Sequence, residues 1–431
     1  MKIMLEIYKL PPEKRRERSL IGRDLILKEF SWEKAASRLV DSAQDWSLIP
    51  KTPSPHIGWI STWNTKCGIA EYSSRLIETV PGRVTIFAPI ADEILEPDTP
   101  NVLRCWRINH DKLDVLDDQV KKNNIDTLVI QFNYGFFSFD NLGSFLNEQI
   151  NSGLIVVIEL HSTRDPVHLS DKKLEKLKIP LSRCHRILVH SINDLNRLKK
   201  IGLVDNVTLF PHGILDYSPV LSSNTDALSS GSWKIASYGF FLPNKGLMEL
   251  VDAVFLLRQN GLNISLKMVN AEYPDPDSTR LIREAIQKIQ DLGLSDDVQM
   301  VTDFLSDTES LALLSEANII VYPYQSTGES ASGAVRHGIA TGRLVAVTPL
   351  EIFDDVSSAV YYLPGQTPEK IAEGIRTLLR EIALESEFIA RIKNEADQWR
   401  NAHRYSHLGR RFYGILQALG MRKQDFENSN I

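Results

Sequence analysis

The sequence predicts an α/β protein with two doubly wound domains, each a parallel sheet covered by helices, and a cleft between the two. Three observations lead to this fold class. The chain has 431 residues, more than one ordinary hydrophobic core accommodates. Short apolar runs alternate with amphipathic segments along most of it, which is typical of parallel sheets. A polar stretch at 216–232 divides this alternation into two arrays of similar size.

The apolar runs are rich in Val, Ile and Leu and are short enough to be strands buried on both faces. They lie at 84–87, 127–132, 154–160, 186–190, 207–210, 235–238, 264–269, 298–301, 319–322, 344–347 and 360–363. The segments between them carry helix-start signals. Ser191 with Asp194 gives a capping-box pattern, and Thr367 precedes Pro368 at a first helical position.

These patterns divide the chain into five segments. They are a helical N-terminal extension (1–52), a first doubly wound domain (53–215), a linker rich in Ser, Asp, Asn and Pro (216–232), a second doubly wound domain (233–400) and a C-terminal helix with its tail (401–431). An aromatic-Ser motif at 30–32 in the extension is echoed at 405–407, and each copy precedes an amphipathic helix. Two unrelated surface helices would give the same pattern.

Composition is that of a soluble globular protein, with 43% hydrophobic and 24% charged residues and a formal net charge of −6. The chain is not basic, so we expect no nucleic-acid partner. Cys67, Cys105 and Cys184 are few and far apart, which favours a reducing compartment over disulfides or a zinc site. No segment resembles a signal peptide or the roughly 18 apolar residues of a membrane-spanning helix. We therefore expect a cytoplasmic protein, with peripheral contact at the inner face of a membrane left open.

Two loops between a strand and a helix carry candidate binding residues. In GWISTWNTKCGIAEYSSRLIE (58–78), Gly68 precedes a helix, and a glycine there lets backbone amides approach a phosphate or a sugar. In YGFFLPNKGLMELVDAV (238–254), Lys245 lies where its charge can balance a pyrophosphate. A glycine turn that serves only the fold, or a solvated surface lysine, would read the same in isolation.

A third loop follows the apolar run at 319–322 and reads STGESASGAVRHGIATGRLVAV from residue 326. Ser332 and Gly333 are small residues at a predicted helix start, which leaves backbone amides uncovered. Glu329 precedes them and Arg336 follows about one turn later. Amides and an arginine suit phosphate, and a carboxylate suits sugar hydroxyls, so this loop is the strongest candidate for binding a sugar diphosphate. The alternative is a small-residue helix that packs closely on the sheet.

Histidines end two of the predicted strands. His161 closes LIVVIELHSTRDP and His212 closes VTLFPHGI, at the strand ends where doubly wound sheets bind ligands. A single such histidine is commonly structural. The pair Asp275 and Asp277 resembles a metal-binding Asp-x-Asp, but it lies in a Pro-rich polar loop, so we expect no metal site there.

Taken in order, these segments resemble the retaining family 4 glycosyltransferases over roughly residues 56–420. The segments that carry the resemblance are TWNTKCGIAEYSSRL, QFNYGFF, HSTRDP, HRILVHSINDL, VTLFPHGI, YGFFLPNKGLMELVDA, ANIIVYPY and GESASGAVRHGIATGRLVAVTPL. Their order, spacing and strand-end positions are specific together. The resemblance implies the GT-B fold: two Rossmann-like domains with a cleft between them and a last helix that crosses back to the first domain.

The resemblance also implies a role for each candidate. The glycine loop faces the donor phosphate and the acceptor, a histidine lies beside the transferred sugar, a lysine pairs with the pyrophosphate, and an acid contacts the donor sugar. The residues in these roles are His161 and Glu329 as the catalytic pair, and Gly68, Lys245, Ser332, Gly333, Arg336 and His337 as donor-binding residues. Such enzymes need neither metal nor cofactor and retain the anomeric configuration, and the leaving phosphate helps to deprotonate the acceptor.

Three positions depart from the family pattern. His337 stands where relatives carry the second Glu of a Glu-x7-Glu element, which commonly grips the ribose; a histidine can also hydrogen-bond a hydroxyl. An arginine usual before Lys245 is absent from Gly239–Leu242, and we hypothesise that Arg336 replaces its charge. Asn133 follows a glutamine where several relatives have His and Glu.

We expect a hexosyltransferase that uses a nucleotide-sugar donor and a saccharide or lipid-linked acceptor, in polysaccharide or glycoconjugate biosynthesis. The alternatives are a catalytically weak GT-B protein that acts as a scaffold or regulator of a partner transferase, and a sugar-nucleotide epimerase or a phosphorylase. The N-terminal 52 residues resemble the C-terminal tail of another such transferase. This suggests that the chain was once the downstream unit of a tandem enzyme.

Overall fold

A computed structural model describes residues 7–29, 34, 36–37, 54–91, 93–109, 112–167, 169, 171–217, 231–329 and 331–429 of the chain. Met1–Pro53 and Ser54–Ile431 are two separate compact units, and each is described by itself. In the first unit, α2 (Pro12–Glu29) is a helix with exposed apolar side chains such as Leu20, Ile21 and Leu25. Most of the predicted extension after residue 29, and most of the predicted linker, lie outside the described residues.

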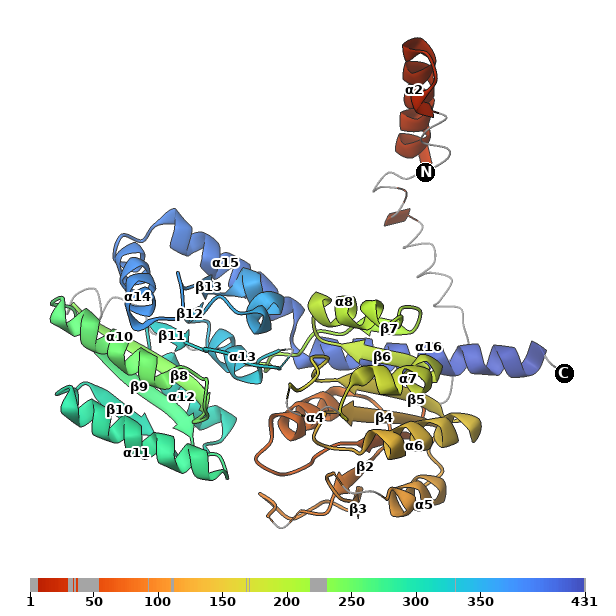
Figure 1. Cartoon of the computed structure of the whole chain (residues 1–431), viewed down its shortest axis with the longest axis horizontal. Helices are drawn as coiled ribbons and strands as arrows, with labels where there is room; N and C mark the ends of the chain where they lie inside the picture. Colours follow the sequence, from red (N-terminus) through yellow and green to blue (C-terminus); the bar gives the residue numbers. More distant parts are fainter. Residues whose placement is uncertain are drawn as a thin grey trace. The chain divides into compact units, whose positions relative to one another are not determined.

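Seven parallel strands form the first sheet of the larger unit, in the order β3-β2-β1-β4-β5-β6-β7 (Figure 1). The strands are β1 (Ile57–Ile60), β2 (Val84–Pro89), β3 (Val102–Trp106), β4 (Thr127–Phe132), β5 (Ile155–Leu160), β6 (Arg186–Val189) and β7 (Val207–Leu209). The connecting helices are α4 (Gly68–Thr79), α5 (Asp114–Lys122), α6 (Phe139–Asn151), η1 (Leu174–Leu177), α7 (Lys178–Arg183) and α8 (Ile192–Lys200). Strands β1, β4 and β5 are buried throughout, which explains their nearly continuous apolar sequence.

Six parallel strands form the second sheet, in the order β10-β9-β8-β11-β12-β13. They are β8 (Ser232–Phe240), β9 (Asn263–Ala271), β10 (Val298–Val301), β11 (Ile319–Tyr322), β12 (Leu344–Val347) and β13 (Tyr361–Tyr362). The helices are α10 (Leu247–Gln259), α11 (Pro276–Asp291), α12 (Asp307–Ser315), α13 (Gly333–Ala340), η2 (Glu351–Ala359) and α14 (Pro368–Ala383). Capping residues begin several of them, including Ser306 of α12 with its capping box and Thr367 of α14.

In each sheet, successive strands are added first toward one edge and then toward the other, so the strand order changes direction at one point. In the first sheet the strand order turns between β1 and β4, and in the second between β8 and β11. The loops that leave the carboxyl ends of neighbouring strands run to opposite faces at such a point, and the crevice between them is the usual ligand position in doubly wound sheets. Each sheet therefore offers one favourable binding edge.

The last helix of the chain returns to the first domain, as predicted. After α15 (Glu387–Ala402), the helix α16 (Tyr405–Ser429) packs beside α4 (Figure 1). The ring of Phe412 lies 5.5 Å from that of Trp59 on β1 and 5.6 Å from that of Phe210. All three side chains are fully buried, so burial of apolar surface holds the end of the chain against the first domain.

Strand β3 is absent from the sequence prediction. Its sequence, VLRCW, contains Arg104, which interrupts the apolar run. The strand lies at the edge of its sheet, and Arg104 pairs there with Asp98 at 2.6 Å. None of the helices that the structure describes combines the length and the apolar character needed to cross a membrane.

Candidate functional site

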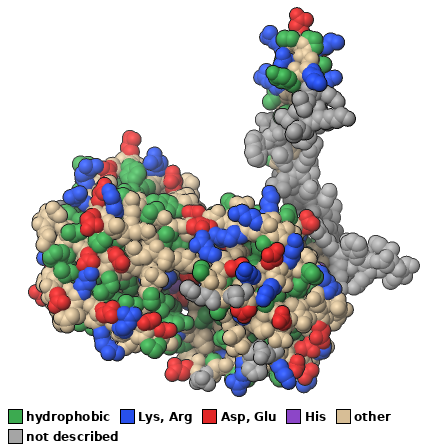
Figure 2. Space-filling model, in the orientation of Figure 1, with side chains coloured by type: hydrophobic (Ala, Val, Ile, Leu, Met, Phe, Trp, Pro, Cys, Tyr) green, Lys and Arg blue, Asp and Glu red, His purple; other side chains and the backbone are tan. Residues whose placement is uncertain are grey.

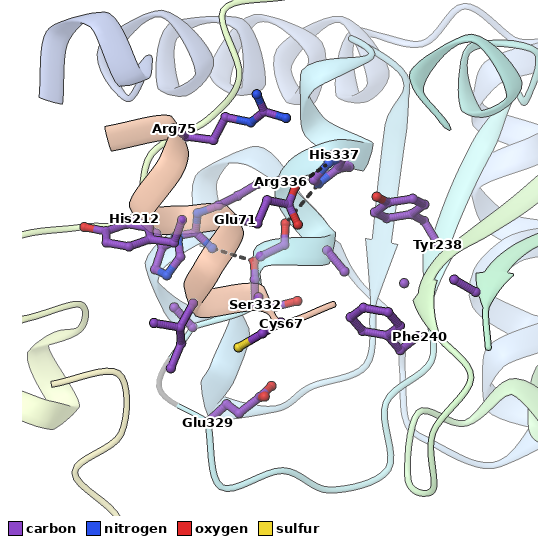
Figure 3. Close-up of a pocket in the computed structure, with 18 of the residues that line it drawn as sticks. Cys67, Glu71, Arg75, His212, Tyr238, Phe240, Glu329, Ser332, Arg336 and His337 are labelled. Carbon is purple, nitrogen blue, oxygen red and sulfur yellow. Dashed lines mark hydrogen bonds and ion pairs between the residues drawn. The ribbon is translucent and has the colours of Figure 1, made fainter. Parts of the chain in front are cut away.

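A cavity of about 410 Å³ lies at the carboxyl ends of the two sheets, and Figure 3 shows part of its wall. Residues from β8, β9, α4, α13 and the loops after β5, β6 and β7 line it. Every candidate residue that the sequence analysis singled out for binding or catalysis borders this one cavity. These residues are Gly68, His161, Lys245, Glu329, Ser332, Gly333, Arg336 and His337.

Two helices begin at the cavity with a glycine. Gly68 is the first residue of α4 and Gly333 the first of α13, and a Cβ atom at either would meet nothing within 4 Å. At α13 the hydroxyl of Ser332 accepts a hydrogen bond from the amide of Val335, whereas the residue before α4, Cys67, makes no side-chain cap. Uncovered amides at the positive end of a helix dipole attract anions. The cavity therefore has two positions that suit phosphate oxygens.

Lys245 projects into the cavity from the loop between β8 and α10. Its Nζ lies 3.6 Å from Oε2 of Glu329 and 4.1 Å from the centre of the Tyr324 ring. Burial favours the neutral amine, but Tyr324 and Glu329 outweigh it and raise the pKa of Lys245, so the side chain is cationic. Its neighbour Gly246 has φ +71°, and a Cβ there would lie 1.8 Å from the carbonyl oxygen of Pro323, so only glycine fits this tight loop.

The side chains of Glu329 and Arg336 differ in their exposure and in their bonding partners. The side chain of Glu329 is 63% exposed and lies at the mouth of the cavity. Arg336 is buried, donates to the carbonyl of Ser332 at 2.8 Å and forms an ion pair with the buried Asp355. The hypothesis that Arg336 supplies a free charge is weakened by this pair, because Asp355 already balances it.

His337 faces two carboxylates rather than open cavity. Its Nε2 lies 3.0 Å from Asp307 and 3.4 Å from Glu71, and Figure 3 shows Glu71 reaching toward it from α4. The ring also stacks on Tyr238, 4.6 Å between centres. Burial opposes protonation, yet Tyr238 and Glu71 raise the pKa of His337 to about 9. The side chain of His337 is thus an imidazolium held between two carboxylates.

Behind the cavity, a chain of buried polar groups begins at Glu159, near the carboxyl end of β5. Its Oε1 accepts from the hydroxyl of Tyr72 at 2.6 Å and its Oε2 from the amide of Gln131 at 2.9 Å. The register of β4 and β5 pairs Gln131 with Glu159 directly. His161 then bonds to Gln131 at 2.6 Å, and His190 bonds to His161 at 3.2 Å. Burial raises the pKa of Glu159, while His190, Tyr72 and Gln131 act in the opposite direction.

This chain of hydrogen-bonded polar groups contains four residues that the sequence analysis did not single out: Tyr72, Gln131, Glu159 and His190. The sequence contains a signal for Glu159, because a glutamate inside an otherwise apolar strand needs a buried hydrogen-bond partner. His190 ends β6 as His161 ends β5, and the register of β5 and β6 places these two strand ends side by side.

Two groups of side chains among the described residues come as close as metal ligands do. They are His161, His190 and His212, and Glu71, Asp307 and His337, each with ligand atoms within 4.8 Å of one another. Hydrogen bonds already join members of each group, so shared protons account for the approach. The acids of the Asp-x-Asp motif serve the fold, because Asp275 caps α11 and Asp277 pairs with Arg280.

No protein-family model and no curated protein sequence matches the chain. Solved structures do match it. Sucrose-phosphate synthase from Thermosynechococcus elongatus has 15% identity and a TM-score of 0.65, over 85% of this chain and 100% of that one. HepE from Anabaena in complex with UDP has 12% identity and a TM-score of 0.67, over 84% and 100%. A glycosyltransferase from Rickettsia africae has 14% identity and a TM-score of 0.67, over 85% and 99%.

At such low identity the comparisons establish the fold. The two parallel sheets, the cleft at their carboxyl ends and the returning C-terminal helix are those of the GT-B architecture. The prediction of this fold class from the sequence is confirmed.

Proposed function

We propose that the chain is a retaining glycosyltransferase that moves a hexose from a nucleotide-sugar donor to a saccharide or lipid-linked acceptor. One observation carries the proposal: the half-buried cation Lys245 and the open starts of α4 and α13 border the same cavity. A diphosphate leaving group needs such preorganised positive charge as its bond to the sugar breaks. Lys245 is paired with Glu329, whose side chain is 63% exposed, whereas Arg336 is paired with the buried Asp355.

The two sheets would divide the substrates between them. Lys245, Ser332 and Gly333 belong to the second domain, which we assign to the nucleotide sugar, while the first domain takes the acceptor. Glu329 at the mouth would contact sugar hydroxyls. Solved GT-B structures of similar fold contain UDP or UDP-glucose, which makes a uridine nucleotide the first candidate donor.

Retention and metal independence belong to the same proposal. They follow from the resemblance to the family 4 enzymes, in which the leaving phosphate assists deprotonation of the acceptor on the same face of the sugar. The helix starts and Lys245 would stabilise the departing diphosphate without a metal ion. NMR of the first product formed gives its anomeric configuration directly, and an inverted product would refute the retaining assignment.

The first experiment is thermal unfolding with UDP, GDP, ADP and dTDP, each with and without magnesium. A nucleotide at about 100 times its dissociation constant stabilises the protein by roughly 2.7 kcal/mol. We expect one nucleotide to raise the midpoint without metal, and Lys245→Met to abolish the effect. Lys267→Met is the matched control, since Lys267 is a similarly exposed lysine of the same domain, paired with Glu316. If no nucleotide stabilises the parent, the proposal fails.

Peripheral membrane contact, which suits a lipid-linked acceptor, is a second part of the proposal. Apolar side chains of the first domain stand exposed, with Val167 at 92%, Ile179 at 72% and Ile192 at 66%. Lysines and arginines gather near α8 (Figure 2), among them Lys199 and Lys200. Basic and apolar groups together bind anionic lipid surfaces. Flotation with vesicles containing phosphatidylglycerol should recover the protein, and Lys199→Glu with Lys200→Glu should abolish recovery; no flotation of the parent would reject this part.

A further inference from the structure

Three histidines meet at the inner end of the cavity, and they differ in their hydrogen bonds. His161 follows β5, His190 follows β6 and His212 follows β7 by three residues, so parallel strands bring them together. The ring of His190 lies between the other two, 4.8 Å from that of His161 and 4.5 Å from that of His212. All three border the cavity and are at least nine-tenths buried.

With Glu159 ionised, counting protons assigns the donors and acceptors of His161 and His190. The carbonyl of Phe210 can only accept, so Nδ1 of His190 donates to it. Gln131 donates its amide to Glu159, so its oxygen accepts from Nε2 of His161. One further proton lies between Nδ1 of His161 and Nε2 of His190. Two imidazoles then hold three protons and one positive charge, with Glu159 as the counter-ion 3.9 Å from His190.

This count leaves no ring nitrogen of His161 for a ligand. Both are bonded to protein groups that are themselves buried, and turning the ring would break two bonds. The expected contact between His161 and a sugar can therefore not be a hydrogen bond from its imidazole while this chain is intact.

His212 is in the opposite state. No hydrogen bond joins His212 to another described residue. Its Nδ1 has no exposed surface, which leaves Nε2 as the ring nitrogen that a ligand in the cavity can reach. Its ring packs on Tyr72, 4.3 Å between centres, and it is 8% exposed. Burial holds the pKa of His212 well below its ordinary value, and the neighbouring His190, Arg336 and His161 act in the same direction. A neutral imidazole offers one donor and one acceptor, which suits a hydroxyl group.

We propose that His212, and not His161, is the histidine that hydrogen-bonds the transferred sugar, through one of its hydroxyl groups. The proposal rests on the function proposed above. It follows from the cavity, because Lys245 and the helix starts take the diphosphate and the hexose is then the part of the donor that reaches the inner end. His161, His190, Gln131 and Glu159 form the rigid support on which His212 and Tyr72 pack.

The test compares His212→Phe with His161→Phe. Phenylalanine keeps the ring that packs on Tyr72 and removes both nitrogens. Binding of UDP, GDP, ADP and dTDP, and of UDP-glucose, GDP-mannose, ADP-glucose and dTDP-glucose, is measured by calorimetry. We expect His212→Phe to bind the nucleoside diphosphate within twofold of the parent and the matching hexose conjugate about tenfold more weakly, the effect of one lost hydrogen bond. His212→Gln, which keeps a hydrogen-bonding group, should recover most of the loss.

The two variants should also separate in stability. His212→Phe leaves no partner unsatisfied and should unfold within about 2 °C of the parent, whereas His161→Phe orphans Gln131 and His190 and should unfold clearly earlier. If His212→Phe binds the hexose conjugate as tightly as the parent, His212 is a packing residue and the proposal is wrong. If the parent binds diphosphates but no hexose conjugate, or binds neither, the function proposed above fails and the role of His212 falls with it.

Discussion

The proton count assigns one positive charge to His161 and His190 together. Replacing His190 by phenylalanine removes this charge and leaves an ionised Glu159 without its counter-ion. Glu159 is 0% exposed and His190 1% exposed, with 3.9 Å between the charged atoms. Breaking one partner of a buried pair costs about 3–5 kcal/mol, because the remaining charge is neither hydrated nor balanced. We expect a loss of this size at pH 7, measured as the free energy of unfolding in urea by circular dichroism.

The pH dependence of this loss identifies its cause. Without the imidazolium, the pKa of Glu159, already raised by burial, rises further in the folded state. A carboxyl group with a raised folded pKa is stabilised below its unfolded pKa and penalised as the pH rises through the folded value. The penalty should therefore shrink on going from pH 7 to pH 5, by up to about 1.4 kcal/mol per pH unit.

The matched control is the double variant Glu159→Gln with His190→Phe, which removes both charges. It should recover about 1–4 kcal/mol of the loss, and its stability relative to the parent should vary less with pH. The reasoning would be refuted if His190→Phe cost less than about 1 kcal/mol and the cost were the same at pH 5 and pH 7. That result would mean that Glu159 is protonated in the parent and that the hydrogen-bond chain runs in the reverse sense, with no charge on the histidines.

Three further outcomes are expected. Gly246→Ala should destabilise the fold by about 2 kcal/mol or more in thermal unfolding, because the added Cβ meets a carbonyl group. Gly293→Ala is the control: Gly293 has φ +66° but no neighbour within 4 Å, so this variant should lose only about 1 kcal/mol. Equal losses would contradict the steric argument. The contact of the His337 imidazolium with Glu71 stabilises the fold fully at pH values below the ordinary pKa of histidine, and this stability is lost as the pH rises through about 9. His337→Gln should remove this part of the pH dependence of unfolding. An unchanged pH dependence would show that another group causes it. Removal of residues 1–53, a separate unit, should leave nucleotide affinity within twofold, and a loss of folding would show instead that the extension is integral.

The fold could be predicted because its signal is local. Strands buried on both faces give nearly continuous apolar runs, as in β4 and β5, and helices between strands carry their own caps, as in α8. The prediction missed β3, where an edge position tolerates Arg104 and the apolar pattern is lost. A strand at the edge of a sheet needs only one buried neighbour, so its sequence constrains it less.

The wall of the candidate site was also within reach of the sequence, for a related reason. Residues that follow parallel strands gather at one edge of the sheet, so Gly68, Lys245 and His161 could be placed near one another from their positions alone. Their partners could not. Tyr72 lies 87 residues from Glu159, and the bond between them depends on how α4 packs over the sheet. Hydrogen bonds of this kind depend on tertiary packing and leave no local pattern in the sequence.

The protonation states of the three histidines are harder to predict from the sequence than their positions. A strand-end histidine suggests a ligand contact, and three of them suggest three equivalent contacts. The carbonyl of Phe210 and the amide of Gln131 remove this equivalence, because the first fixes a donor on His190 and the second fixes a donor on His161. Burial, helped by the neighbouring His190, lowers the pKa of His212, and His212 makes no hydrogen bond to another described residue. One main-chain oxygen, of Phe210, and one side-chain oxygen, of Gln131, thus bind His190 and His161, which leaves His212 for the ligand contact proposed above.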